Sequence, residues 1–245
     1  MDTNYFELCK QMVSDREISL GGIGTLGEKT VHSTLKQYFA GDLLNQEIKI
    51  GPYFADVCVD GHVFEIQTRH FRNLRDKLAF FLPEYKVTVV YPVTYVNYLR
   101  WIDPVSGEIS APKKSTRRGN PLQVFDELYR IRPFLSDPNF SLKIILLETE
   151  EYRMLDGYGK HKKAKATKCD NLPLSLIAEY DIDVPYDYMM LLPPELPDTF
   201  TAKDFARLAK IPVSLAQTTL LLLSELSLIQ RTGKSGNAYL YEFSI

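Results

Sequence analysis

The sequence predicts an α/β protein in which a mixed sheet is flanked by helices and followed by a small C-terminal domain. Residues 25–92 have the pattern of a helix, three short strands, a second helix and a further strand. After residue 199, two helical patterns precede a hairpin that contains glycine. The 245 residues are 45% apolar and 24% charged, which is ordinary for a globular protein of one large domain or two modest ones.

The region up to residue 93 is the more regular half of the chain. Its expected elements are helices over 5–17, about 25–39 and 68–82, and strands over 45–50, 53–60, 62–67 and 85–93. Gly41 ends the second helix, and Gly51-Pro52 separates the first two strands. The helix over 68–82 is amphipathic, since its large apolar residues recur at helical spacing. They are Phe71, Leu74, Leu78 and Phe81.

The chain beyond residue 93 is expected to hold fewer regular elements. They are an exposed loop or hairpin over 103–121, a helix over 121–135, a buried strand over 141–148 and a mobile basic arm over 157–171. The proline-rich segment 184–198 is expected to link an α/β domain over 1–192 to a small domain over 199–245. Two helices followed by a glycine-containing hairpin are typical of the end of a winged helix.

Composition narrows the class of protein. The first fifteen residues lack the basic and apolar regions of a signal peptide, and no apolar run is as long as a membrane span requires. Cys9, Cys58 and Cys169 are few and far apart, which favours a reducing cytoplasm over a disulfide framework or a zinc site. Because the net charge is −2, any affinity for nucleic acid has to come from local basic patches.

Two acids lie inside predicted strands of the stretch "ADVCVDGHVFEIQT". Asp60-Gly61 is a strong signal for a two-residue type I′ hairpin turn, because both residue types tolerate positive φ. Counting outward from that turn pairs Asp56 with Glu65, and Gln67 points to the same face. Like charges directly opposite one another are destabilising, and removal from water makes this worse. A divalent cation with a preference for oxygen ligands, Mg²⁺ or Mn²⁺, would reverse the sign of that interaction.

The two acids could also have a purely structural role. Both carboxylates could lie at an exposed end of the sheet, or one of the arginines that follow could pair with them. These arginines are Arg69, Arg72 and Arg75, which could instead contact a phosphate. A turn shifted by one residue would also separate Asp56 from Glu65.

The layout of residues 20–92 resembles the PD-(D/E)XK nuclease superfamily. Its core runs helix, three antiparallel strands, helix, strand, with the first acid on the second strand and the E-x-K motif on the third. Ala55-Asp56 stands where that family has "PD", and "EIQ" (65–67) stands where it has E-x-K. Glu28 fits the place of a glutamate that often completes the site from the first helix. The resemblance also implies the Ile66 carbonyl as a metal ligand.

The resemblance implies a restriction-endonuclease-like domain and a Mg²⁺- or Mn²⁺-dependent endonuclease that hydrolyses DNA, with a homodimer as an expected assembly. The motif is an E-x-Q variant, as in some restriction endonucleases of the superfamily. Gln67 can donate a hydrogen bond but does not carry the positive charge of the usual lysine. The alternative is therefore a catalytically inactive nuclease fold that binds DNA and uses its winged helix for recognition.

The start of the second helix has competing interpretations. Thr25 and Glu28 form a capping box, in which Glu28 would serve the helix and not a metal. His32 lies one turn further along and could face the same site or simply pack. The sequence "GIGTLG" matches a dinucleotide-binding pattern, but no clear strand precedes it and a hairpin follows, so a nucleotide cofactor is not expected.

Two basic clusters and the C-terminal domain are the candidate contacts to DNA. The clusters are Lys113, Lys114, Arg117 and Arg118 in the loop, and Lys160, Lys162, Lys163, Lys165 and Lys168 in the arm. Such runs are also common on ordinary solvated faces. In the C-terminal domain we expect contacts from Gln217 on the second helix and Lys234 on the hairpin, although winged helices also bind proteins.

Overall fold

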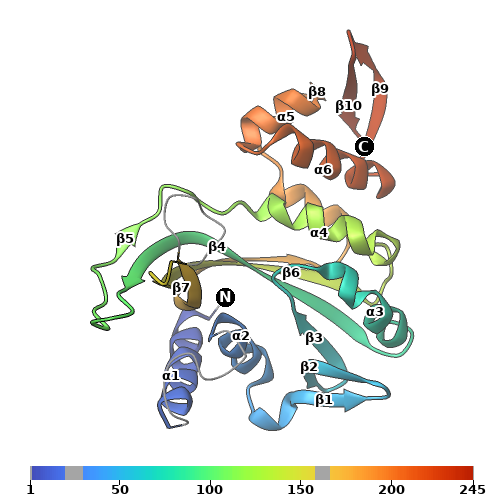
Figure 1. The fold of residues 1–245 in the computed structure, drawn as a ribbon. Coiled ribbons are helices and arrows are strands. Elements are labelled where there is room, and N and C mark those ends of the chain that lie inside the picture. The colour runs from blue at the N-terminus through green and yellow to red at the C-terminus, as the bar shows by residue number, and fades with distance from the viewer. Residues whose placement is uncertain (1, 20–29, 158–165, 245) are drawn as a thin grey trace. The chain divides into compact units, whose positions relative to one another are not determined.

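The computed structural model describes residues 2–19, 30–157 and 166–244 (Figure 1). The helices are α1 (Thr3–Ser19), α2 (Thr30–Ala40), η1 (Leu43–Asn45), η2 (Phe71–Leu74), α3 (Arg75–Phe81), η3 (Pro121–Gln123), α4 (Val124–Ile131), η4 (Arg132–Phe134), η5 (Pro185–Leu191), α5 (Ala202–Ala209) and α6 (Val213–Glu225). The strands are β1 (Gln46–Ile50), β2 (Tyr53–Val59), β3 (His62–Ile66), β4 (Lys86–Ile102), β5 (Lys113–Lys114), β6 (Phe140–Met154), β7 (Thr167–Ile182), β8 (Thr199–Thr201), β9 (Ile229–Ser235) and β10 (Ala238–Phe243).

The predicted α/β class is confirmed, because a large mixed sheet is flanked by helices. The strand order is β1-β2-β3-β4-β6-β7, and β5 pairs with β4. A separate three-stranded sheet has the order β8-β10-β9. Among the described residues, no helix is both long and apolar enough to cross a membrane. The chain forms two compact units, the first from residues 1–60, 92–119 and 145–179, and the second from 61–91, 120–144 and 180–245.

The first unit is organised around α2. Helix α1 packs against α2, which also contacts β1 and β2. Helix α1 buries Phe6, Cys9 and Val13, whose spacing places them on one helical face. Leu35 of α2 is fully buried. Strands β1 and β2 are antiparallel, with Ile48 opposite Ala55, so the predicted strands over 45–50 and 53–60 are confirmed.

The turn after β2 has the predicted conformation. Asp60 has a φ of 49° and Gly61 a φ of 78°. Positive φ at both central residues is what a type I′ turn requires. Along β2, Ala55 and Val57 are fully buried while Asp56 is half-buried, so successive side chains alternate between environments as in a regular strand.

The second unit contains a parallel strand pair. Strand β3 pairs in parallel with β4, with Glu65 opposite Val89, and the chain between them forms η2 and α3. A helical crossover is the usual way to join parallel strands. The predicted apolar stripe is confirmed, since four side chains of this helical segment are buried: Phe71, Leu74, Leu78 and Phe81. Helix α4 contacts η2 and buries Phe125 and Leu128.

The residues after 199 belong to the second unit. Thr201 caps α5 in a capping box with Asp204. Helix α6 packs against α4 and α5, and the Asn120 side-chain amide donates to the Ala209 carbonyl over 2.9 Å. Leu220, Leu222 and Leu223 are fully buried, as their apolar run predicts. The predicted helix pair and hairpin are therefore present, and the short strand β8, which the sequence did not indicate, joins the hairpin.

Two predictions for the second half of the chain were wrong. Residues 167–171 were expected in a basic arm, but they begin β7. The start of β7 was not predicted because Asp, Asn and Pro are depleted in strands, and this segment contains Asp170, Asn171 and Pro173. The first half of the expected linker forms η5, because Tyr188 is buried against Phe125 with ring centroids 5.6 Å apart. Strands β4 and β6 are also longer than predicted.

The turn geometry predicts the effect of removing glycine. A Cβ added at Gly61 would meet no atom within 4 Å, so the cost of Gly61→Ala is backbone strain alone. We expect a loss of about 1–2 kcal/mol of unfolding free energy, measured by urea denaturation. Asp60→Asn is the matched control and should be neutral, because Asn suits a type I′ turn. A Gly61→Ala protein as stable as the wild type would contradict the turn assignment.

Candidate functional site

Asp56 lies on β2 in the first unit and contacts the helix α2. His32 Nε2 is 3.4 Å from Asp56 Oδ2, and the two side chains are 26% and 18% exposed. Both groups therefore reach solvent while resting against protein. Of the two alternatives for His32, a place beside Asp56 or simple packing, the structure shows His32 in contact with Asp56. A carboxylate beside an imidazole can bind a metal ion or hold a proton.

The start of the described part of α2 is held by β7. Asp170 is buried and accepts a hydrogen bond from the Thr30 hydroxyl. The Asn171 backbone amide donates to Asp170 over 2.7 Å, and the Thr30 amide adds a longer contact of 3.4 Å. Thr30 is two residues before His32, so the Asp170 carboxylate fixes the turn of helix that brings His32 to Asp56.

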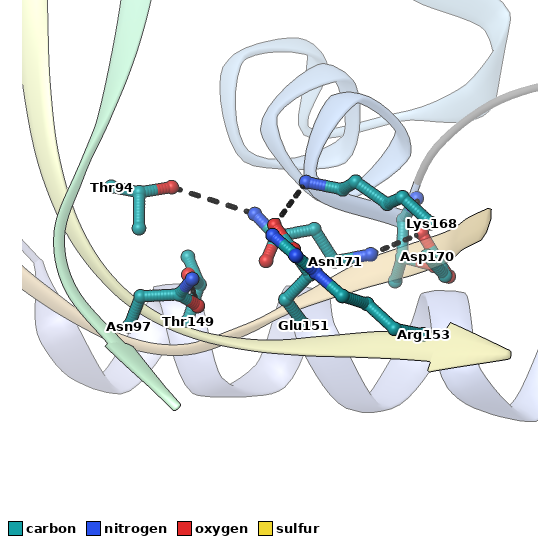
Figure 2. Close-up of polar contacts among 9 residues, drawn as sticks. Thr94, Asn97, Thr149, Glu151, Arg153, Lys168, Asp170 and Asn171 are labelled. Atoms are coloured by element: carbon teal, nitrogen blue, oxygen red, sulfur yellow. Dashed lines mark hydrogen bonds and ion pairs between the residues drawn. The ribbon is translucent and has the colours of Figure 1, made fainter. Parts of the chain in front are cut away.

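Asp170 belongs to a polar cluster on three strands of the first unit. Figure 2 shows Thr94 and Asn97 from β4, Thr149, Glu151 and Arg153 from β6, and Lys168, Asp170 and Asn171 from β7. Glu151 is buried and accepts hydrogen bonds from Lys168 Nζ (2.6 Å) and from Arg153 Nε. These partners explain how a carboxylate is accommodated at this position. The sequence did not indicate the cluster, because Lys168 was expected in an arm.

The pKa of Glu151 reflects these contacts. Burial raises it, but the hydrogen bonds and charges of Lys168 and Arg153 outweigh burial and hold the pKa below the usual value of 4.5. Other side chains of the cluster also form hydrogen bonds with one another. Thr149 donates to Asn97 over 3.1 Å, and Asn171 donates to Thr94 over 3.5 Å. We therefore interpret the cluster as the support that positions α2.

Glu65 lies on β3 in the second unit. Its side chain is only 3% exposed. Lys77 of α3 donates to both carboxylate oxygens, over 3.0 Å to Oε1 and 2.8 Å to Oε2. A buried carboxylate needs such a partner, since an unpaired buried charge is strongly destabilising. The sequence did not single out Lys77, whose only signal was its place on the helix that follows the E-x-Q motif.

The other residues predicted for the metal site differ in their positions and contacts. Gln67 is half-buried and its amide donates to the Arg69 carbonyl over 2.6 Å, so it closes the loop after β3. The Ile66 side chain is buried at the end of β3. Glu28 lies outside the described residues. Asp56 and Glu65 fall in different units, and their pairing across the turn stays a prediction.

No metal-binding group of three or more His, Cys, Asp or Glu side chains occurs among the described residues. The expected metal site uses fewer such ligands from that part of the chain, because Glu28 lies outside it. The described donors are the carboxylates of Asp56 and Glu65 and the Ile66 carbonyl. Carboxylate and carbonyl oxygens are suitable ligands for Mg²⁺ or Mn²⁺.

The basic loop of the first unit is exposed and lies beside aromatic rings. Lys113 and Lys114 form β5, which pairs with β4. Lys114 Nζ lies 5.7 Å from the centroid of Tyr98, and the Arg118 guanidinium lies 5.7 Å from that of Tyr95. Arg117 is also exposed. In the other predicted cluster, Lys160, Lys162, Lys163 and Lys165 lie outside the described residues, whereas Lys168 lies on β7 and donates to Glu151.

Gln217 and Lys234 are exposed in the C-terminal part of the second unit. Lys234 Nζ lies 5.0 Å from the Tyr239 ring centroid, and the Arg231 guanidinium lies 4.4 Å from the same ring. Gln217 and Tyr239 both line a hollow of about 410 Å³ beside the hairpin. This surface combines positive charge with an aromatic face.

The chain belongs to a protein family. A family described as a domain of unknown function (DUF8091) matches residues 29–183, which is more than half of the chain. The chain is also similar to an uncharacterized protein of Treponema pallidum (strain Nichols), with 28% identity over 186 residues, which cover 76% of this chain and 74% of that protein. No solved structure matches significantly. The family region contains Asp56, Glu65 and Lys77 and ends before residue 199.

The depressed pKa of Glu151 predicts how stability changes with pH. Below pH 4.5 the unfolded chain takes up the proton more readily than the folded one, so the contribution of Glu151 is present at neutral pH and lost in acid. The difference in unfolding free energy between wild type and Glu151→Gln should therefore shrink as the pH falls below 4.5 and through the lower pKa of the folded state. Urea titrations at several pH values measure it. Exposed Glu84→Gln is the control, and a difference that stays constant with pH would contradict the paired state of Glu151.

Proposed function

We propose that the chain is a metal-dependent nuclease that hydrolyses DNA, with a restriction-endonuclease-like domain and a C-terminal winged helix. The order α2, β1, β2, β3, α3, β4 and the parallel pairing of β3 with β4 support this fold. Asp56 on the second of these strands and Glu65 on the third match the acid positions of the PD-(D/E)XK pattern. In this proposal they share one Mg²⁺ or Mn²⁺ ion.

The observation that carries the proposal is the turn between β2 and β3. Positive φ at Asp60 and Gly61 supports a two-residue turn, and counting four residues outward on each side leads to Asp56 and Glu65. Two carboxylates in that register repel one another unless a cation or a proton lies between them. A bound metal ion would lower the pKa of its water and stabilise charge on the reacting phosphate.

Lys77 supplies the positive charge that Gln67 lacks. The Lys77 ammonium contacts both oxygens of Glu65, as a cation at that carboxylate would. Lys77 and a metal ion would therefore compete for Glu65. With a metal ion bound at Glu65, the Lys77 ammonium would contact that carboxylate less closely and could face a phosphate of the substrate. Gln67 would orient water, and His32 would hold the Asp56 carboxylate in place.

The three-stranded sheet and the helices before it support a winged helix in the C-terminal part. Its order β8-β10-β9 brings a short strand before α5 into contact with the hairpin. Exposed Gln217 and Lys234, with the Tyr239 ring beside them, form a surface suited to a phosphate backbone. The basic loop with Lys113, Lys114, Arg117 and Arg118 would contact DNA from the first unit.

A second candidate function is DNA binding without cleavage. The observation that favours it is the use of site residues in structural contacts, since Gln67 bonds to Arg69 and both oxygens of Glu65 are taken by Lys77. If no metal displaces Lys77, Glu65 serves only to hold α3 on β3, and Asp56 only contacts His32 of α2. The winged helix would then provide recognition.

Removal of Asp56 tests the proposed nuclease. Cleavage of single-stranded, duplex and branched DNA is measured with Mg²⁺ and with Mn²⁺. Loss of a metal ligand should remove several kcal/mol of transition-state stabilisation, so Asp56→Ala should cut at least about 100-fold more slowly. Asp76→Ala, which removes an exposed acid from α3, should cut like the wild type. Metal-dependent cutting that survives Asp56→Ala would overturn the site, and no cutting by the wild type on any substrate would favour the binding function.

Replacement of Lys77 tests whether Glu65 can exchange its partner. Lys77→Met should lower the unfolding free energy by about 3 kcal/mol, because it removes the ammonium that contacts both oxygens of a buried carboxylate. Mg²⁺ or Mn²⁺ should recover part of this loss and raise the melting temperature of Lys77→Met more than that of wild type. Lys77→Arg keeps the charge and is the control. If neither ion raises the melting temperature of Lys77→Met, Glu65 is not a metal ligand.

A further inference from the structure

Four arginines line one pocket of the second unit. The pocket has a volume of about 310 Å³ and is formed by Arg72, Arg75, Tyr129, Arg130, Arg132 and Pro133. It lies between the helical segment after β3 and the end of α4. None of these arginines belongs to the two basic clusters predicted to contact DNA. The sequence indicated Arg72 and Arg75 as possible phosphate contacts, but it did not indicate Arg130 and Arg132, which lie far from them along the chain.

Packing explains why two of the arginines face outward together. Phe71 and Leu74 of η2 are buried, so Arg72 and Arg75 are left on the exposed side, one helical turn apart. The Glu127 carboxylate accepts a hydrogen bond from the Phe71 amide over 2.9 Å and ties η2 to α4. The two halves of the pocket are therefore joined by a defined contact within one unit.

The other two arginines lie at the end of α4. Arg130 is in its last turn, and Arg132 follows it in η4. The Arg132 guanidinium lies 4.7 Å from the Tyr129 ring centroid, which is a stacking distance. Both arginines are exposed. Cations at a helix C-terminus are favourable, but that effect does not explain Arg72 and Arg75.

The positive charge of the pocket is only partly balanced. Arg132 Nε is 4.0 Å from Glu225 Oε2, and Asp126 lies near enough to Arg130 to interact with it. Among the described residues, no carboxylate lies within ion-pairing distance of the Arg72 or Arg75 side chain. In a chain of net charge −2, four converging guanidinium groups form a local site for an anion.

We infer that this pocket holds phosphate groups of a nucleic-acid strand. Guanidinium groups bind phosphate through paired N–H donors, and several phosphates in a row suit several arginines. The Tyr129–Arg132 stack adds a flat surface of the kind on which bases stack. Pockets for small metabolites are mostly apolar, whereas this one is lined by charged side chains that reach solvent. The inference deepens the proposed function, because it rests on nucleic acid as the substrate.

Fluorescence anisotropy with labelled oligonucleotides in EDTA tests binding without cleavage. Single-stranded DNA and the matching duplex are the probes. The double variant Arg72→Ala/Arg75→Ala should weaken binding at least about tenfold, since it removes two charge-assisted contacts. The slope of log affinity against log salt for duplex should fall by about 2. Arg207→Ala, at an exposed arginine outside the pocket, should bind as the wild type does.

The outcomes separate this inference from the proposed nuclease. If the double variant binds oligonucleotides as tightly as the wild type, the pocket does not bind nucleic acid, whether or not the wild type cleaves DNA. If the wild type binds through these arginines but does not cut with Mg²⁺ or Mn²⁺, the nuclease proposal is rejected and the inference about the pocket stands. Loss of binding to inorganic phosphate or to anionic phospholipid vesicles, with oligonucleotide binding intact, would assign the pocket to another phosphate source and overturn the inference.

Discussion

Carboxylates buried in a sheet must receive donors from a neighbouring element, because an unpaired buried charge costs several kcal/mol. In the first unit Thr30 supplies one to Asp170, and this bond ties the described start of α2 to β7. In the second unit Lys77 supplies one to Glu65 and ties α3 to β3. Helices α2 and α3 are therefore held on the sheet by hydrogen bonds to these carboxylates as well as by their apolar faces.

These same bonds place the groups that chemistry would use. The Asp170 contact fixes the helix turn from which His32 reaches Asp56 at 3.4 Å. The Glu65 contact brings a lysine to the strand where the motif itself carries Gln67. In the proposed nuclease the positive charge has therefore moved from the strand to the helix that packs on it. Whether Glu65 binds a metal ion more strongly than it binds Lys77 decides whether this carboxylate serves catalysis or only holds α3 on β3.

Local patterns in the sequence were enough to predict the elements near the acids. Residues close in sequence determine three of these features. They are the Asp60-Gly61 turn, the alternating burial of β2 and the apolar stripe from Phe71 to Phe81. Strand β7 and helix η5 were missed, because residues that disfavour strands or suggest a linker are overruled there by tertiary packing. Tyr188 is the clearest case, since its burial converts part of a proline-rich segment into structure.

The polar partners could not be predicted, because they depend on contacts far apart in sequence. Thr30 and Asp170 are separated by 140 residues, and neither residue type indicates the other. Lys77 has the pattern of a solvated helix lysine until its helix is packed on β3. The four-arginine pocket likewise joins residues before β4 to residues before β6. The acids could be found from the sequence, whereas the groups that surround them required the fold.

Calorimetric titration of Mn²⁺ into the protein tests the central claim most directly, because it measures the metal site without a substrate. The proposed shared site predicts saturable binding to the wild type that is lost in both Asp56→Asn and Glu65→Gln, while Asp76→Asn binds like the wild type. Wild-type affinity in either Asp56→Asn or Glu65→Gln would contradict the account, because the two carboxylates would then not hold one ion.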